Sequence, residues 1–147
     1  MFKNKNILFS FPLMFIGLIM VFLGSRWLIH DEPWMLDKVA NEERLDMTFE
    51  TLFQSDINKN LPGYLKQIYR FFGLWVSIIG LFILSFSRYD FVKNKDIRIA
   101  LLICIGVMVI SGMILGYNLI PKSPFIYLGW ILFLLFLLPL YAHKKYE

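Results

Sequence analysis

Cysteine occurs once in this chain of 147 residues, at Cys104, and histidine occurs only twice. A single cysteine excludes a disulfide framework and the two-cysteine relay of a membrane thiol oxidoreductase. Glycine and proline together number only 15 residues, which excludes collagen-like and low-complexity linker sequence. Charged residues make up 18% of the chain, against about 25% in a typical soluble domain. The chain therefore lacks the composition of a soluble globular protein.

Apolar residues dominate instead, at 58% of the chain, and phenylalanine alone contributes 15. A helix needs about 20 mostly apolar residues to span a membrane, and lysine or arginine at its ends can extend to the interface. Four runs contain no charged residue, at 6–25, 71–87, 99–121 and 123–142. The sequence predicts an all-α membrane protein, a four-transmembrane-helix bundle forming one domain over residues 1–147. We expect spans at about 7–29, 65–88, 98–120 and 124–142, and a short amphipathic helical outer loop at 30–63.

The first run follows Lys3 and Lys5, as the core of a signal peptide would. Its apolar stretch from Ile7 to Gly24 is too long for such a core, however, and no small-x-small cleavage site follows. We therefore expect a retained membrane helix.

Charge placement predicts the orientation of these spans. Eight basic residues flank the expected ends on one side: Lys3, Lys5, Arg88, Lys93, Lys95, Arg98, Lys144 and Lys145. The loop at 30–63 carries eight acidic and three basic residues, a net charge of −5. Because basic residues collect on the cytoplasmic side, the pattern predicts a bacterial inner (plasma) membrane protein with both termini in the cytoplasm and the acidic loop outside. The pI near 9.2 then reflects cytoplasmic anchors, and we expect no nucleic-acid partner.

The acidic loop contains signals for local structure. Asp31-Glu32-Pro33 is typical of a helix start, and Thr48 could cap a short helix that presents Phe49, Leu52 and Phe53 on one face. Asn60-Leu61-Pro62-Gly63 predicts a turn before the second span. We expect the amphipathic pieces to pack on the outer end of the bundle, because their acidic residues would be repelled by anionic headgroups.

Several chemistries lack the residues that they need. His30 and His143 fall on opposite sides of the membrane, so they cannot join in one metal or bis-histidine haem site, and we expect no metal and no cofactor. No charged residue lies in the middle of a span, which removes the usual proton-relay and ion-coupling groups of pumps and transporters.

A set of polar and aromatic residues remains near the expected outer boundary. Arginine can hold an anionic headgroup or a carboxylate, whereas tryptophan can either anchor at the interface or wall a pocket. The candidate ligand-binding residues are Arg26, His30, Arg70, Trp75, Asn118 and Trp130. The alternative is that each arginine pairs with a loop acid such as Asp31 or Glu32, or extends into the headgroups.

Small residues on the spans predict close helix packing, because lipid provides no hydrophobic drive between helices. The candidate packing positions are Gly73, Ser77 and Gly80 in the second span, and the Gly112 and Gly116 pair in the third. Packing inside the bundle is the first interpretation, and the face of a homo-oligomer is the alternative.

Short motifs spread over most of the chain also suggest a family. They are Phe15-Ile16-Gly17, Leu61-Pro62, Tyr69-Arg70-Phe71-Phe72-Gly73, Ile78-Ile79-Gly80-Leu81-Phe82-Ile83-Leu84 and Arg98-Ile99-Ala100. In their order and hydropathy, the sequence resembles the DoxX-like small bacterial membrane proteins. The resemblance implies a four-helix inner-membrane bundle, and some members look like accessory subunits of redox or stress-response complexes.

Two functions follow from these observations. The first is a non-catalytic membrane protein that binds a lipophilic molecule or a partner membrane protein at its outer face. The alternative is a small membrane enzyme or enzyme subunit that acts on a lipid through His30, Arg70 and a carboxylate of Asp31 or Glu32. An enzyme needs these groups to converge, whereas a binding protein needs an apolar pocket with one or two polar contacts.

Overall fold

The computed structural model describes residues 2–145, with side chains from residue 6 onward. The side chains of Lys3 and Lys5, which enter the charge count, lie outside the described residues. All secondary structure elements in the described range are helices, and the four long ones are α1 (Phe2–Ile29), α4 (Leu61–Phe86), α5 (Lys95–Leu119) and α6 (Phe125–Lys144). Each of the four is long and apolar enough to cross a membrane, which confirms the predicted number of candidate spans.

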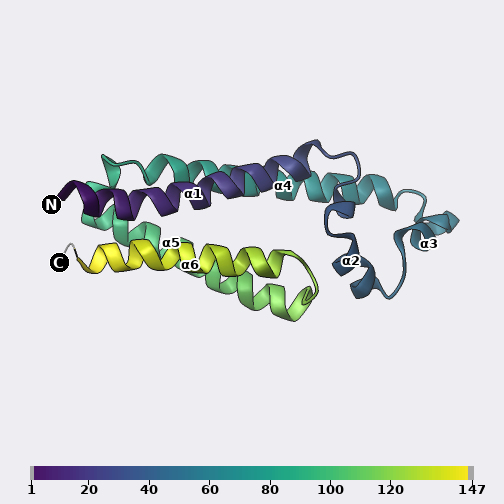
Figure 1. Cartoon of the computed structure of the whole chain (residues 1–147). Coiled ribbons are helices and arrows are strands. Elements are labelled where there is room, and N and C mark those ends of the chain that lie inside the picture. The colour runs from purple at the N-terminus through teal and green to yellow at the C-terminus, as the bar shows by residue number, and fades with distance from the viewer. Residues whose placement is uncertain (1, 146–147) are drawn as a thin grey trace.

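Short helices fill most of the connection between α1 and α4, which we call the acidic segment (residues 30–60). They are the 3₁₀ helix η1 (Pro33–Asp37), α2 (Lys38–Leu45), α3 (Phe49–Gln54) and the 3₁₀ helix η2 (Asp56–Asn58). A further 3₁₀ helix, η3 (Phe91–Lys93), lies between α4 and α5. Figure 1 shows both termini at one end of the molecule, the termini end, and the acidic segment at the opposite end, the loop end.

The turn predicted over Asn60-Leu61-Pro62-Gly63 is confirmed only at Asn60, because α4 already begins at Leu61. Pro62 lies in the first turn of the helix, where its missing N–H would have no intrahelical acceptor, so the proline is compatible with a helix start. As a result α4 extends beyond α1 at the loop end and reaches the level of the acidic segment (Figure 1).

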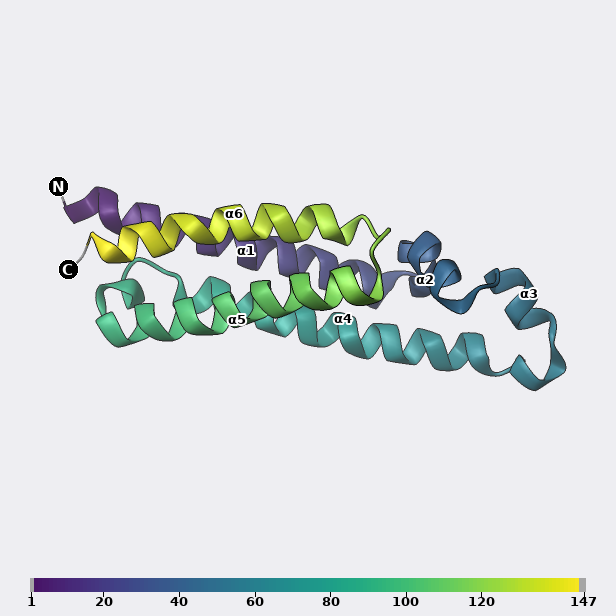
Figure 2. The same ribbon diagram turned by 90° about the horizontal axis from the view of Figure 1, so that it is seen from below.

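The long helices form two pairs, α1 with α4 and α5 with α6. The pairs are joined mainly by packing of α1 against α6, whereas α4 and α5 scarcely touch. Figure 1 shows the two pairs diverging toward the loop end, and Figure 2, seen from below, shows α6 lying over α1 and α5 lying over α4.

Glycine carbonyls bring α1 and α4 into backbone contact. A Cβ atom at Gly24 would lie 2.5 Å from the carbonyl oxygen of Gly73, and one at Gly17 would lie 2.9 Å from that of Gly80. Gly17 and Gly24 are seven residues apart on α1, as are Gly73 and Gly80 on α4. Seven residues make about two helical turns, so the two glycines of each helix lie on one face. Ser77 lies in the same contact, against Gly24. The sequence identified the positions on α4, but not their partners Gly17 and Gly24 on α1.

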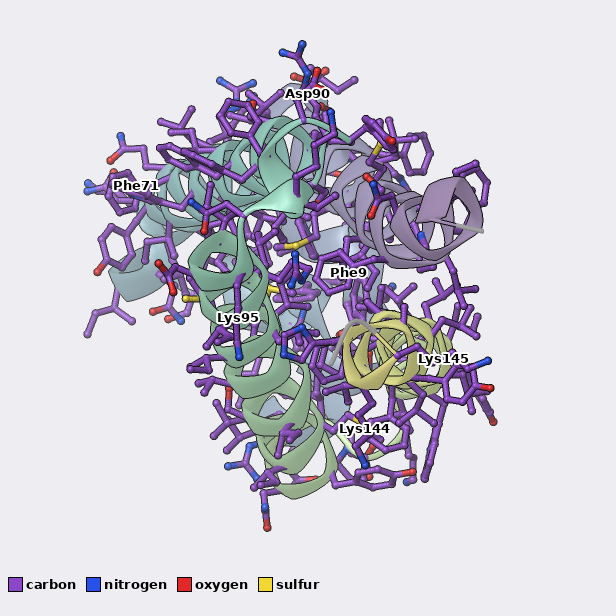
Figure 3. The ribbon with its side chains drawn as sticks, turned by 90° about the vertical axis from the view of Figure 1, so that its left-hand side faces the viewer. Phe9, Phe71, Asp90, Lys95, Lys144 and Lys145 are labelled. Atoms are coloured by element: carbon purple, nitrogen blue, oxygen red, sulfur yellow. The ribbon has the colours of Figure 1, made fainter. Side chains whose placement is uncertain are left out.

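The main apolar core lies toward the termini end. Phe9, Leu13 and Ile16 of α1 are fully buried, and Ile105 of α5 and Phe136 of α6 pack into the same cluster. Figure 3, a view along the bundle from the termini end, shows Phe9 among the helices, whereas Phe71 of α4 points outward.

Arg98 has a different position from the one expected. The sequence predicted that Arg98 would be an exposed basic residue at the cytoplasmic end of a span, but Arg98 is only 6% exposed. Its guanidinium donates hydrogen bonds to the carbonyl oxygens of Val92 (2.9 Å) and Lys93 (3.0 Å), and to Nδ1 of His143 (3.4 Å). The arginine therefore ties the α4–α5 connection to α6. Nearby, the Ser10 hydroxyl donates to the carbonyl of Ser87, joining α1 to the same connection.

Candidate functional site

The acidic segment has a small core of its own. Trp34 and Phe49 are each 4% exposed, and Phe53 packs against both rings, with its centroid 5.8 Å from that of Trp34 and 5.5 Å from that of Phe49. Thr48, the residue expected to cap a helix here, accepts a hydrogen bond from the backbone N–H of Thr51. The segment is therefore folded, and it does not have the character of a flexible linker.

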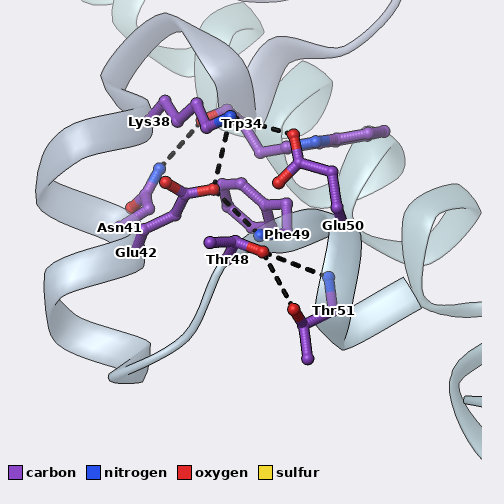
Figure 4. Close-up of polar contacts among 8 residues, drawn as sticks. All are labelled: Trp34, Lys38, Asn41, Glu42, Thr48, Phe49, Glu50 and Thr51. Carbon is purple, nitrogen blue, oxygen red and sulfur yellow. Dashed lines mark hydrogen bonds and ion pairs between the residues drawn. The ribbon is translucent and has the colours of Figure 1, made fainter. Parts of the chain in front are cut away.

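Polar contacts hold the pieces of this segment around the aromatic core, as Figure 4 shows. Lys38 pairs with Glu50 (3.0 Å), and the Glu42 carboxylate accepts from the backbone N–H of Phe49 (2.9 Å). Asn41 donates to the carbonyl oxygen of Trp34 (2.9 Å). These contacts join α2 to α3 and to η1, so the segment can act as one unit.

Two side-chain contacts tie this unit to the turn between α5 and α6. The Ser123 hydroxyl donates to Oδ2 of Asp37 (2.8 Å) and accepts from the backbone N–H of Phe125 (3.1 Å). Lys122 forms an ion pair with Glu43 (2.7 Å). Because η1 also packs on α1 and α4, the acidic segment bridges the two helix pairs at the loop end, where they diverge.

Of the two contacts, the one through Asp37 is the less exposed. Ser123 is 1% exposed, and the second carboxylate oxygen of Asp37, Oδ1, is buried without a hydrogen-bond partner among the described residues. Burial raises the pKa of Asp37 above its ordinary value, and the hydrogen bond from Ser123 opposes part of that shift. Burial therefore disfavours the charged form of Asp37, and the protonation state of this carboxylate affects the contact between the acidic segment and the α5–α6 turn.

Beneath the acidic segment, a cavity of about 270 Å³ lies among the four long helices. Its walls include Met20 and Trp27 of α1, Phe72 of α4, Met113 of α5, and Phe125 and Leu128 of α6. On α6 the lining runs from Phe125 to Leu132, which corresponds to a depth of about 10 Å at the rise of an α-helix. The cavity is apolar and occupies the space that the diverging helix pairs leave at the loop end.

Trp27 is one of the residues that line this cavity, and its indole carries a polar atom, the nitrogen Nε1. Its ring contacts Phe72 of α4 (centroids 5.0 Å apart) and Phe125 of α6 (5.4 Å). The residue is 8% exposed, and its indole Nε1 is buried without a hydrogen-bond acceptor among the described residues. The sequence left two interpretations open for tryptophans near this boundary, an anchor at the interface or the wall of a pocket. The burial of Trp27 between three helices agrees with the second interpretation and not with the first.

Two of the charged residues predicted to bind a ligand, His30 and Arg70, lie near enough to Asp31 to act on its charge, but they do so away from the cavity. Arg26 and Arg70 are exposed, and Nδ1 of His30 accepts from the backbone N–H of Glu32 (3.1 Å). Asp31 pairs with Lys66 (3.1 Å), and the Lys66 ammonium holds the pKa of Asp31 below its ordinary value. None of the three residues predicted to bind a ligand, Arg26, His30 and Arg70, lines the cavity.

The other three predicted residues also lie outside the cavity. Trp75 and Trp130 are about half exposed, and the indole of Trp130 donates to the hydroxyl of Tyr117 (2.7 Å). Asn118 donates to the carbonyl of Ile114 in its own helix (2.7 Å). Trp75 and Trp130 therefore do not wall this cavity.

The glycine pair on α5 differs from the glycines of α1 and α4. A Cβ atom at Gly112 would have no neighbour within 4 Å, and one at Gly116 would meet only the side chain of Ile126, at 3.1 Å. Gly112 therefore makes no tight helix contact. It lies instead in the wall of the cavity.

Sequence reasoning missed Asp37, Ser123 and the position of Trp27. Ser123 stands before Pro124, a pair that favours a turn, and this could have marked the start of α6. No local pattern could have paired Ser123 with a carboxylate 86 residues away. A tryptophan buried between helices and a tryptophan exposed to lipid both have apolar neighbours in the sequence. The sequence alone therefore does not show which of these positions Trp27 takes.

Among the described residues, no group of three histidine, cysteine or acidic side chains could hold a metal ion. No protein-family model, curated protein or solved structure matches this chain. The resemblance to DoxX-like proteins stays a prediction, and a functional assignment has to rest on the geometry of the loop end.

Proposed function

We propose that this chain is a multi-pass membrane protein that binds a lipophilic ligand at its outer face and carries out no chemistry on it. The observation that supports this most is the apolar cavity beneath the acidic segment. A binding site of this kind needs an apolar space and few polar groups, and both are present there.

The acidic segment would then act as the cover of the site. It spans the gap between the helix pairs through Asp37 and Ser123 on one side and through η1 on the other. The alternative, an enzyme acting through His30, Arg70 and a loop carboxylate, has less support. His30 and Arg70 lie near Asp31, but His30 accepts a hydrogen bond from the backbone of Glu32, Asp31 pairs with Lys66, and none of these groups lines the cavity.

Native purification in mild detergent, followed by mass spectrometry of the co-purifying lipids and proteins, tests this proposal. We expect one lipophilic compound in about equal molar amount with the protein. Recovery of only bulk lipids, in the proportions of the source membrane, would refute ligand binding. A stoichiometric partner protein without a lipophile would favour the partner-binding function in its place.

We further propose the orientation that the charge pattern predicts, with the termini end in the cytoplasm of a bacterial inner membrane and the acidic segment outside. The exposed lysines at the termini end and the carboxylates at the loop end support it. A Cys104→Ser background allows single-cysteine probes at Leu45 and Lys144. An impermeant maleimide added to intact cells should label Leu45→Cys and spare Lys144→Cys, and the reverse pattern would contradict the orientation.

A further inference from the structure

The two helices that scarcely touch, α4 and α5, leave an apolar groove between them, with a volume of about 550 Å³. The buried side chains of Ile83 and Ile105 line its inner part, and the exposed rings of Phe82 and Phe86 line its rim. Because exposed side chains belong to the lining, the groove opens on the outer surface of the bundle. The described residues that line it include no charged or amide side chain, so the part of a molecule that lies here is hydrocarbon.

Two short side chains on α5 help to keep the groove open. Ala100 and Cys104 are one helical turn apart on the same helix face, and both are exposed. On α4 the rings of Phe82 and Phe86 stack on each other (centroids 6.3 Å apart), and Phe86 also contacts Phe91 beyond the end of the helix (5.6 Å). These ring contacts support the α4 wall, and the short side chains of α5 leave space beside it.

The length of the groove matches one leaflet of a bilayer. On α5 the lining runs from Ile97 to Met108, which corresponds to about 16 Å at the rise of an α-helix. The apolar core of a bilayer is about 30 Å thick, so one leaflet contributes about 15 Å. Ile97 lies in the first turn of α5 and Phe86 is the last residue of α4, so the groove begins at the termini end. It ends at Met108, which also lines the cavity at the loop end.

The width of the groove favours one hydrocarbon chain. Its volume divided by its length gives a mean cross-section of about 33 Å², or about 6.5 Å across. An α-helix with its side chains is about 10–12 Å wide, so a partner helix does not fit inside. Carbon atoms in contact lie about 4 Å apart, so one chain fits, whereas two chains side by side, about 8 Å, do not. The dimensions are those of one acyl chain of a lipid in the leaflet at the termini end.

The groove begins beside the basic connection between α4 and α5. Arg88 follows Phe86 by two residues, Lys95 precedes Ile97 by two, and Lys93 lies between them in the chain. All three basic side chains are exposed. Figure 3, seen from the termini end, shows Lys95 at this end of the bundle. Residues 87–98 contain four basic and two acidic residues, a net charge of +2.

This end suits an anionic headgroup better than the loop end does. The acidic segment at the loop end carries a net charge of −5, so the two ends differ in sign. The pair between Lys93 and Asp90 (2.9 Å) is solvent-exposed and therefore weak, so a phosphate can replace the carboxylate. Tyr89, exposed in the same connection, is of the type that concentrates at the level of the headgroups. Each lysine or arginine near a membrane surface strengthens the attraction to anionic lipid about fivefold.

On this basis we propose that the groove between α4 and α5 binds one acyl chain of an anionic phospholipid, whose headgroup lies at the termini end beside Arg88 and Lys93. The second chain of the lipid stays in the bilayer. This site is separate from the cavity beneath the acidic segment, and it goes beyond the proposed function.

Photoreactive phospholipids test the site directly. The full-length protein is reconstituted in phosphatidylcholine vesicles with a trace of a lipid that carries a diazirine midway along one acyl chain. The headgroup of this probe is either anionic phosphatidylglycerol or zwitterionic phosphatidylcholine, and the adducts are mapped by mass spectrometry after irradiation. We expect adducts on the groove residues Phe82, Cys104 and Met108, at least about fivefold more with the anionic probe.

Filling the groove should remove the chain. Ala100→Phe and Cys104→Phe each place a ring in the groove from an exposed position, so labelling should fall at least about fivefold in both variants. Ile103→Phe is the matched control, because Ile103 is exposed on the same helix but does not line the groove. It should leave labelling within about twofold of the wild type.

Removing charge at the termini end tests the headgroup. The double variant Arg88→Gln, Lys93→Gln should lower labelling by the anionic probe at least about fivefold and leave labelling by the zwitterionic probe within about twofold. Lys59→Gln, which removes an exposed basic residue from the loop end, is the control and should change neither.

Three results would overturn the proposal. Equal labelling of the groove by the two probes would contradict the anionic headgroup. Labelling that includes Ile103 as strongly as the groove residues, and that survives Ala100→Phe and Cys104→Phe, would show ordinary bilayer contact only. A cross-link between Cys104 of two copies on mild oxidation, with no labelling of the groove, would show that a second copy covers it. Each of these results leaves the proposed function untouched, because Ala100 and Cys104 do not line the cavity beneath the acidic segment.

Discussion

Replacing Gly24 with alanine should separate the two helices that the structure holds in backbone contact. The new Cβ atom would lie 2.5 Å from the Gly73 carbonyl oxygen, against at least 3.4 Å in ordinary van der Waals contacts. Either α1 and α4 move apart by about 0.9 Å or the contact stays compressed. Overpacking of this kind costs about 1–3 kcal/mol, and alanine returns up to about 1 kcal/mol through its better helix propensity. We expect a net loss of about 1–2 kcal/mol.

Two further alanine substitutions make the test specific. At Gly17 the Cβ atom would lie 2.9 Å from the Gly80 carbonyl oxygen, so the loss should be smaller than at Gly24. At Gly112 nothing lies within 4 Å, so Gly112→Ala should be neutral or stabilise by up to about 1 kcal/mol.

Unfolding by SDS in mixed micelles, followed by circular dichroism, measures these differences. The order of stability should be Gly112→Ala, then Gly17→Ala, then Gly24→Ala, with about 1–3 kcal/mol between the first and the last. Equal midpoints for Gly24→Ala and Gly112→Ala would show that the α1–α4 contact is not as close as the structure has it.

Three other predictions concern polar groups. Because burial raises the pKa of Asp37, the folded state binds the proton more tightly than the unfolded state, so stability should decrease as pH rises from about 3.8 through the folded pKa. Asp37→Asn should flatten this part of the pH–stability profile, and an unchanged slope would contradict the assignment. Arg98→Met should cost about 2–3 kcal/mol and make the α4–α5 connection sensitive to protease, because the buried carbonyl of Val92 and the partly buried carbonyl of Lys93 lose their donor; Arg88→Met, at an exposed position, is its control, and equal sensitivity of both would refute the role. Glu43→Gln should change stability by less than about 0.5 kcal/mol, since its pair with Lys122 is solvent-exposed, and a larger loss in SDS unfolding would show that this pair holds the acidic segment in place.

The positions of the four candidate spans follow from the sequence because a membrane-spanning helix needs a long run without charge, and such runs are few. The expected ends agree with the helices to within five residues, and the largest differences are at the starts of α1 (Phe2, expected at 7) and α4 (Leu61, expected at 65). Capping is also local, so Thr48 could be identified from its own neighbourhood. Four apolar helices, their order, and the acidic character of the connection between the first two were thus determined by the sequence alone.

Which face of each helix points inward was decided only by the tertiary structure. Lipid accepts apolar side chains as readily as the protein interior does, so the hydrophobic pattern of a spanning helix does not mark its buried side. Trp27 is buried and Trp130 is half exposed, although both lie in the loop-end part of a long apolar helix. Gly24 touches a neighbouring backbone and Gly112 borders a cavity, although both are glycines of spanning helices. The bond between Asp37 and Ser123, like the cavity beneath it, exists only once the helices have taken their places.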